Sequence, residues 1–174
     1  NNLKIVDYNY KSNGSILQSE IILKNDFINE SIKKPIKKIF FEKIKLEKKY
    51  QKKNKNLLLF NGFYSLDNSN YKKFSFKNNL NKKVQNYFID LDLTENVFFE
   101  IINFQTNAKK KSNIKVEYTV ENKKSIFKTM EFREGKNTIS VKGLVLNNKN
   151  EIEKLSSIKI LTFKKNEENN NFII

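Results

Sequence analysis

Hydrophobic and polar residues alternate along much of the second half of the chain. The segment 114–120 is the clearest case, with Ile114, Val116, Tyr118 and Val120 separated by Lys, Glu and Thr. A period of two places one set of side chains on a core and the other set in water, as on a half-buried β-strand. We therefore predict a strand here with a polar outer face.

Further segments of this kind follow one another at short intervals. Segment 84–93 alternates in the same way, and segment 97–105 carries apolar residues on both faces, which predicts a central strand covered on both sides. Strands are also expected at 126–132, 138–146 and 157–163, with turn residues between them. Short strands spaced by about 8–12 residues, without amphipathic helices between them, predict an all-β fold built as an antiparallel β-sandwich.

The core of this sandwich should come from the apolar positions of these strands. Residues 84–163 are expected to form at least five antiparallel strands. The side chains expected between the two sheets are Ile89, Leu91, Ile114, Val116, Tyr118 and Ile160.

The first half of the chain is less regular. Segments 3–10 and 16–23 look like two strands joined by a turn at Asn13-Gly14. After Pro35, segment 36–46 fits either a helix or an edge strand whose lysines face water, and the lysine content favours the strand.

We expect one domain, since its 174 residues suit a single core. It would consist of an irregular basic part (1–56), the regular sandwich (57–165) and a polar tail (166–174). The final residues 172–174 are either an ordered last strand or the start of further sequence.

The composition excludes several kinds of chemistry. The chain has no His and no Cys, so thiol catalysis, disulfides, imidazole acid–base catalysis and zinc sites built from these ligands are not expected. Only four Gly are present and no phosphate-binding loop is found. No apolar run approaches the roughly 18–20 residues needed to cross a bilayer. We expect a non-enzymatic protein with no cofactor, no metal and no membrane-spanning segment.

The net charge of +15 suggests an anionic partner, and the basic residues are concentrated in the segment Lys33–Lys55, which holds eleven Lys and two Glu. This segment is a candidate surface for an anionic polymer or a protein partner. However, 33 of the 34 basic residues are Lys, and the Lys- and Asn-rich composition is typical of an AT-rich genome. Codon usage therefore accounts for part of the basicity, and nucleic-acid binding ranks third, below glycan binding and protein–protein interaction and above an enzyme.

A cluster of aromatic, amide and carboxylate residues lies at 61–76. Sugars are held by this mixture, because aromatic rings stack against C–H bonds and Asp or Asn side chains pair with hydroxyl groups. The candidate ligand-binding residues are Tyr64, Asp67, Asn70 and Tyr71, together with Arg133, the only guanidinium in the chain. Alternatively, the aromatic residues of the cluster belong to the core, Asp67 forms a turn and Arg133 is a solvated charge.

Two motifs in this part of the chain resemble a known family. The pattern Gly62-Phe63-Tyr64-x-x-Asp67, followed by Lys73-Phe74-Ser75, resembles a Gly-Trp-Tyr-x-x-Glu … Arg-Trp-Ser/Thr pattern of galactose-binding-like jelly-roll domains in bacterial surface-glycan proteins, including domains attached to glycosyltransferases. The segment 130–141, with Gly-x-Asn between two strands, and its partner 157–160 are similar to segments of the same folds. The resemblance covers 58–165 and implies a jelly roll and a glycan ligand, with Phe in place of both motif tryptophans.

Acidic residues offer a further possibility. Asp90 and Asp92 share one face of a strand and Glu100 follows on the next, so a glycosidase pair or a Ca²⁺ site is conceivable. A water-facing strand explains the same alternation. An intramolecular Lys–Asn isopeptide bond, as in some adhesin sandwiches, is another possibility. A sequence this rich in Lys and Asn neither favours nor excludes it.

The leading hypothesis is a non-catalytic glycan-binding or accessory module of a bacterial cell-surface or glycan-assembly protein. The alternative is a structural or protein–protein interaction domain of a bacterial surface or secretion assembly, which would dock through Lys33–Lys55 and an exposed sheet edge. The lack of Cys fits a reducing cytosol as well as a bacterial surface, and the initial Asn suggests a processed or excised chain. A surface or secreted location is favoured over a cytoplasmic one.

Overall fold

The computed structural model describes residues 9–29, 32–51, 55–81, 84–93, 96–107, 110–164, 167–169 and 172–173. Nearly all of them lie in β-strands, and the only helical element in these ranges is the short 3₁₀ helix η1 (Glu100–Ile102). The all-β class predicted from the alternation is confirmed. Across the described part of the chain, no helix has the length and apolar character needed to span a membrane.

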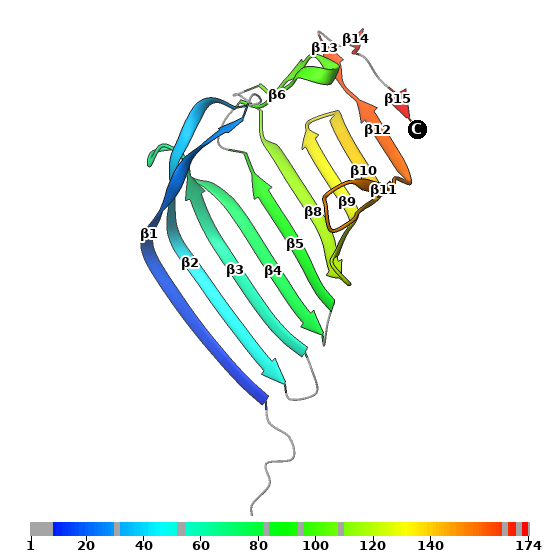
Figure 1. The fold of residues 1–174 in the computed structure, drawn as a ribbon. Coiled ribbons are helices and arrows are strands. Elements are labelled where there is room, and N and C mark those ends of the chain that lie inside the picture. Colours follow the sequence, from blue (N-terminus) through cyan, green and yellow to red (C-terminus); the bar gives the residue numbers. More distant parts are fainter. Residues whose placement is uncertain are drawn as a thin grey trace, which may run out of the picture.

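One large antiparallel sheet contains most of the strands (Figure 1). In spatial order these are β1 (Asn9–Asn29), β2 (Ile32–Gln51), β3 (Lys55–Ser65), β4 (Lys72–Asn81), β5 (Val84–Asp92), β8 (Ser112–Glu121), β9 (Lys124–Glu134), β10 (Asn137–Leu146), β12 (Ser157–Leu161) and β15 (Phe172–Ile173), and β11 (Ile152–Lys154) pairs with β10. Six of these strands lie within 84–163, where at least five were predicted. Along most of this order, strands that are neighbours in the sheet are also neighbours in the chain, so the sheet is a meander without the crossovers of a jelly roll.

Two small hairpins lie over one end of the large sheet (Figure 1). They are β6 (Phe98–Phe99) with β7 (Phe104–Gln105), on either side of η1, and β13 (Phe163–Lys164) with β14 (Glu167–Glu168). Ile102 and Phe104 of the first hairpin pack against Phe132 and Ile160 of the large sheet, and all four are buried. Two layers therefore enclose a core at this end.

The predicted central strand at 97–105 is wrong. Asn103 adopts a left-handed conformation (φ 48°) directly after η1, which turns the chain back on itself. Phe99, Ile102 and Phe104 of this segment instead supply the upper layer of the core, with Phe99 beside Phe132 at a ring-centroid distance of 5.0 Å.

The large sheet has one apolar and one polar face. Two adjacent rows of side chains that cross the sheet along its register show this plainly. The apolar row is Phe60, Phe76, Ile89, Val116, Met130, Val141 and Ile158, and the polar row is Lys45, Asn61, Ser75, Asp90, Lys115, Glu131, Ser140 and Lys159. Because the pleat alternates, successive side chains point to opposite faces, and the bulges in β2 and β9 shift this alternation by one residue.

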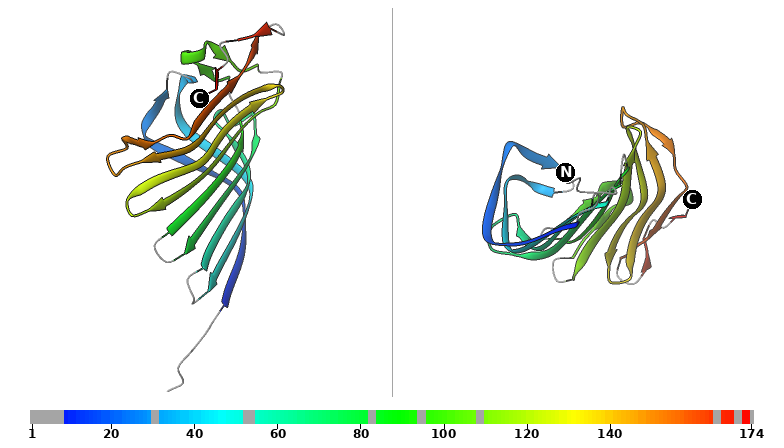
Figure 2. Two further views of the ribbon diagram at one scale, coloured as in Figure 1. Left: turned by 90° about the vertical axis from the view of Figure 1, so that its right-hand side faces the viewer. Right: turned by 90° about the horizontal axis from the view of Figure 1, so that it is seen from below.

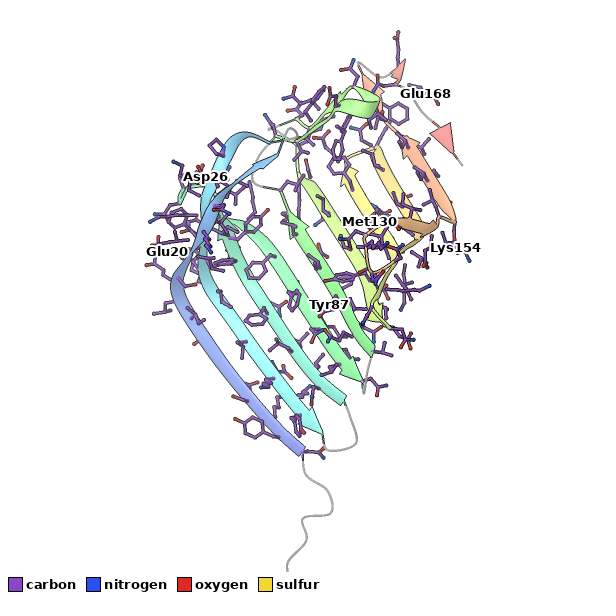
Figure 3. The ribbon with its side chains drawn as sticks, in the orientation of Figure 1. Glu20, Asp26, Tyr87, Met130, Lys154 and Glu168 are labelled. Atoms are coloured by element: carbon purple, nitrogen blue, oxygen red, sulfur yellow. The ribbon has the colours of Figure 1, made fainter. Side chains whose placement is uncertain are left out.

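The sheet is strongly curved (Figure 2), and its apolar face carries a hollow. Tyr87 and Met130, which are labelled in Figure 3, belong to this face. Ile160 is buried as predicted. In contrast, Ile89 and Val116 are only half-buried, because the small hairpins that cover the core end do not pack against this part of the sheet. The predicted burial between two layers is thus confirmed at one end of the sheet only.

The first part of the chain is more regular than predicted. The turn expected at Asn13-Gly14 is wrong, since β1 continues through both residues and pairs them with Glu47 and Leu46 of β2. Long strands β1 and β2 pair side by side, so each supplies the hydrogen-bond partners that a local hairpin would have supplied. The strand predicted at 36–46 is confirmed, although β1, not β2, is the edge. Most of the strand predicted at 3–10 lies outside the described residues.

Candidate binding site

The turn between β3 and β4 is organised by Asp67. Its Oδ1 atom accepts hydrogen bonds from the Ser65 hydroxyl (2.7 Å) and from the backbone N–H groups of Ser69 and Asn70 (2.9 Å each). The Asn70 N–H, the Ser65 hydroxyl and the Ser69 N–H lower the pKa of the Asp67 carboxyl, because all three favour its charged form. Asp67 therefore has a structural role in the turn in addition to the ligand contact predicted for it.

The other two candidates of the turn lie beside it. Asn70 is exposed, and Tyr71 is half-buried, with its hydroxyl donating to Asn68 Oδ1 at 2.6 Å. Tyr64 stands at the end of β3 on the apolar face, in edge-to-face contact with Phe74 at a centroid distance of 6.3 Å. Four of the predicted residues are thus gathered at one end of the β3–β4 hairpin.

Arg133 lies elsewhere, on the polar face of β9. Its side chain is exposed and its Nη2 atom lies 2.8 Å from Glu131 Oε1. In the register it stands directly opposite Asn113 of β8. The structure therefore separates Arg133 from the turn and places it next to a different feature, a groove on the polar face.

This groove crosses the polar face from β2 to β8 and has a volume of about 550 Å³. Its lining combines cationic, carboxylate and amide side chains with one half-buried aromatic ring, that of Phe63. The lining residues are Lys43, Lys45, Asn61, Gly62, Phe63, Lys73, Phe74, Ser75, Asp90, Asp92, Lys111, Asn113 and Lys115. Two of them, Lys43 and Lys45, belong to the basic segment Lys33–Lys55.

The two carboxylates of the groove are held by a single amide. Asn113 Nδ2 donates to Asp90 Oδ1 at 2.7 Å and to Asp92 Oδ1 at 3.0 Å. The second oxygens pair with lysines, Asp90 with Lys115 at 3.2 Å and Asp92 with Lys111 at 3.1 Å. The pair is therefore fixed as an acceptor set on the groove floor. No cluster of three acidic side chains suited to a metal occurs among the residues that the structure describes.

The lysines at the other side of the groove are less engaged. Lys43 occupies a bulge with φ 51°, and its Nζ atom lies 3.4 Å from Glu42 and 5.9 Å from the centroid of the Phe63 ring. Lys45 and Lys73 are exposed, and neither forms an ion pair with any described residue. These two ammonium groups are available to an anion.

Gly62 explains why the hairpin strands approach so closely here. A Cβ atom at this position would lie 3.0 Å from the Ile44 Cα atom and 3.2 Å from the Glu42 carbonyl oxygen. Only glycine lets β3 pass the bulge of β2 at this distance. The glycine of the Gly62-Phe63-Tyr64 motif is thus required by packing.

The sequence had indicated most of the groove's residues singly but not together. The Asp pair was expected on a water-facing strand, and the basic segment was expected as a separate surface. No family model, no curated protein and no solved structure matches this chain in comparisons with known proteins.

Proposed function

We propose that this protein is a non-catalytic module that binds an acidic glycan in the groove of the polar face. The observation that carries the proposal is the composition of the groove, in which five lysines surround two carboxylates, two amides and one aromatic ring. The Asp90–Asn113–Asp92 set offers acceptors to sugar hydroxyls, since the Asn113 amide already donates to both carboxylates. Lys45 and Lys73 would pair with carboxylate, sulfate or phosphate groups of the glycan.

The turn at 66–71 extends this surface. It directly continues β3 and β4, which line the groove through Phe63 and Lys73. A glycan chain longer than the groove would reach Asn70 and Tyr71 at one end and Arg133, beside Asn113, at the other. The motif resemblance at Gly62–Asp67 and Lys73–Ser75, and not the strand order of the sheet, extends the proposal to a bacterial surface-glycan system.

Calorimetry with polygalacturonate as the acidic glycan and dextran as the neutral one tests this function. We expect heat on addition of polygalacturonate that falls with added salt, because exposed charges are screened. Lys45→Gln and Lys73→Gln should each weaken binding roughly two- to fivefold, the range of exposed ion pairs. Lys77→Gln is the matched control, since Lys77 is an exposed lysine of β4 on the same face outside the groove. Equal losses of affinity in all three variants would contradict binding in the groove.

A second candidate function, protein–protein interaction, is favoured by the edge strand β1. Within the described residues β1 has a partner on one side only, and Leu17 and Ile22 are 81% and 67% exposed. An open edge of this length can receive a strand of another protein. Light scattering separates the two candidates: a defined assembly that dissociates in a Leu17→Lys, Ile22→Lys variant supports interaction through β1.

A further inference from the structure

The apolar face contains a second hollow, independent of the polar groove. It has a volume of about 420 Å³ and spans from β1 to β5. Its lining residues are aliphatic or aromatic except for two serines and the Tyr64 hydroxyl. They are Ser19, Ile21, Ile39, Phe41, Ile44, Phe60, Tyr64, Phe74, Ser75, Phe76, Ile89 and Leu91. This volume falls within the range of about 300–1,000 Å³ that is typical of small-molecule sites.

The lining makes the hollow unsuited to a polar ligand. The Tyr64 hydroxyl donates to the Asp92 carbonyl oxygen and is therefore already engaged. A sugar placed here would lose water from its hydroxyl groups without gaining partners, which costs free energy. A hydrocarbon chain would instead exchange water for contacts with Phe41, Phe60 and Phe76.

The hollow is equally unsuited to an added strand. Its floor is formed by β2, β3, β4 and β5, and each of these strands is paired on both sides. Their backbone groups are therefore used within the sheet, and affinity must come from side chains. This distinguishes the hollow from the open edge at β1.

One cation stands at the turn end of the hollow. Lys72 is directly opposite Tyr64 in the register and shares the parity of Phe74, so it belongs to the apolar face. Its side chain is half-buried, and no described carboxylate lies within ion-pair distance of it. Lys72 lies beside the lining of the hollow and is not part of it, and an ammonium group next to an apolar lining is complementary to an amphiphile with one anionic head group.

We infer that the apolar hollow binds a long-chain fatty acid, with its hydrocarbon chain along the lining from Phe76 to Ile39 and its carboxylate at Lys72. The apolar side chains supply the affinity, since burial of each methylene is favourable. Lys72 orients the chain by pairing with its charged end. The two linings have only Phe74 and Ser75 in common, which are neighbours on β4 and belong to opposite faces of the sheet.

Displacement of a bound fluorescent probe, dansylundecanoic acid, by decanoate, dodecanoate and tetradecanoate measures this binding. We expect the affinity to rise about fourfold for each added methylene, the ratio given by about 0.8 kcal/mol per buried methylene. Dodecanol, which has the same chain without the charge, should bind more weakly than dodecanoate. An affinity independent of chain length would overturn the inference.

Two matched pairs of variants locate the site. Ser19→Trp places a large ring in the hollow and should remove probe binding, whereas Gln18→Trp, the adjacent exposed position opposite Glu42 on the polar face, should leave it unchanged. Lys72→Gln should weaken dodecanoate binding roughly tenfold, as for a lost charge-assisted hydrogen bond, and Lys73→Gln should not. Lys73→Gln is also the variant expected to weaken glycan binding. A failure of the glycan proposal can therefore be distinguished from a failure of the fatty-acid proposal.

Three results would overturn the inference. The first is equal probe affinity in Ser19→Trp and Gln18→Trp. The second is equal dodecanoate affinity in Lys72→Gln and Lys73→Gln. This comparison remains decisive when Ser19→Trp does not fold. The third is a wild-type dimer in light scattering that takes up no probe, because a second copy then covers the hollow.

Discussion

The hydroxyl of Tyr64 donates a hydrogen bond of 2.7 Å to the backbone carbonyl oxygen of Asp92, 28 residues further along the chain. Tyr64 is the last residue but one of β3 and lies on the apolar face, and Asp92 ends β5, with its carboxylate in the polar groove. The bond passes over β4, which lies between the two strands. The bond therefore fixes two ends relative to each other: the end of the apolar hollow beside the β3–β4 turn, and the end of the polar groove that holds the Asp92 carboxylate.

Loss of the Tyr64–Asp92 hydrogen bond should lower the stability of the fold by a measurable amount. Tyr64→Phe keeps the ring against Phe74 but leaves the Asp92 carbonyl without this donor, so we expect the free energy of unfolding to fall by about 1 kcal/mol. Urea denaturation measures the change. Tyr71→Phe is the control, because the Tyr71 hydroxyl donates to the exposed Asn68 side chain, and its loss should cost less. A larger loss in Tyr71→Phe than in Tyr64→Phe would contradict this assignment.

The Asp67 carboxylate should make stability depend on acid pH. Its pKa is lowered in the folded protein by the Asn70 N–H, the Ser65 hydroxyl and the Ser69 N–H, from an ordinary value of 3.8. A group with a lowered pKa stabilises the fold above its unfolded pKa and loses this effect as the pH falls toward the folded pKa. The stability difference between wild type and Asp67→Asn should therefore be constant above about pH 5 and shrink below about pH 4.

Unfolding curves recorded from neutral to acid pH test the Asp67 prediction. Glu168→Gln serves as the control, since Glu168 is an exposed carboxylate outside the turn. A difference between wild type and Asp67→Asn that persists unchanged to the lowest pH would show that the charge of Asp67 is not what stabilises the turn.

Gly62 should not tolerate even one added methyl group. In Gly62→Ala the new Cβ would meet the backbone of β2 at 3.0 Å, so the strands must separate, and overpacking of this kind costs about 1–3 kcal/mol. Gly14→Ala is the matched control, because nothing lies within 4 Å of a Cβ at Gly14. We expect its thermal midpoint to stay close to that of the wild type. Equal midpoints for both variants would rule out the close approach at Gly62.

The core at the hairpin-covered end should account for more stability than the open face. Phe132 is 4% exposed and lies between Phe99 and Phe104, so Phe132→Ala should cost about 3–5 kcal/mol. Phe88, on the polar face, is 36% exposed, and Phe88→Ala should cost far less. Chemical denaturation of both variants compares them. Similar losses would mean that the sheet is stabilised evenly along its length.

The sequence predicts the strands well where the alternation is complete. Segment 114–120 is the best example, because its period of two fixes both the strand and its faces. The same reasoning fails at Asn13-Gly14, where a favourable turn pair is overridden by pairing with β2, and at Asn103, where a single left-handed residue divides an apolar segment. Pairing with a strand distant in sequence decides the first case, and a single backbone angle decides the second.

The groove could not be predicted as a unit, for a related reason. Lys45, Asn61, Ser75, Asp90 and Lys115 lie 14 to 25 residues apart in sequence, and only the register brings them into one row. That register depends on the bulge at Lys43, since a shift by one residue would move each side chain to the other face. Neither the bulge nor the resulting neighbours can be read from the residue types alone.

The meander order of the large sheet has a consequence for folding during synthesis. From β1 to β5, each strand pairs with the strand made immediately before it, so no segment has to wait for a distant partner. Local pairing of this kind closes small loops, which lowers the entropic barrier of each step. The sheet can therefore grow by accretion of one strand at a time as the chain leaves the ribosome, with the newest strand always serving as the template for the next.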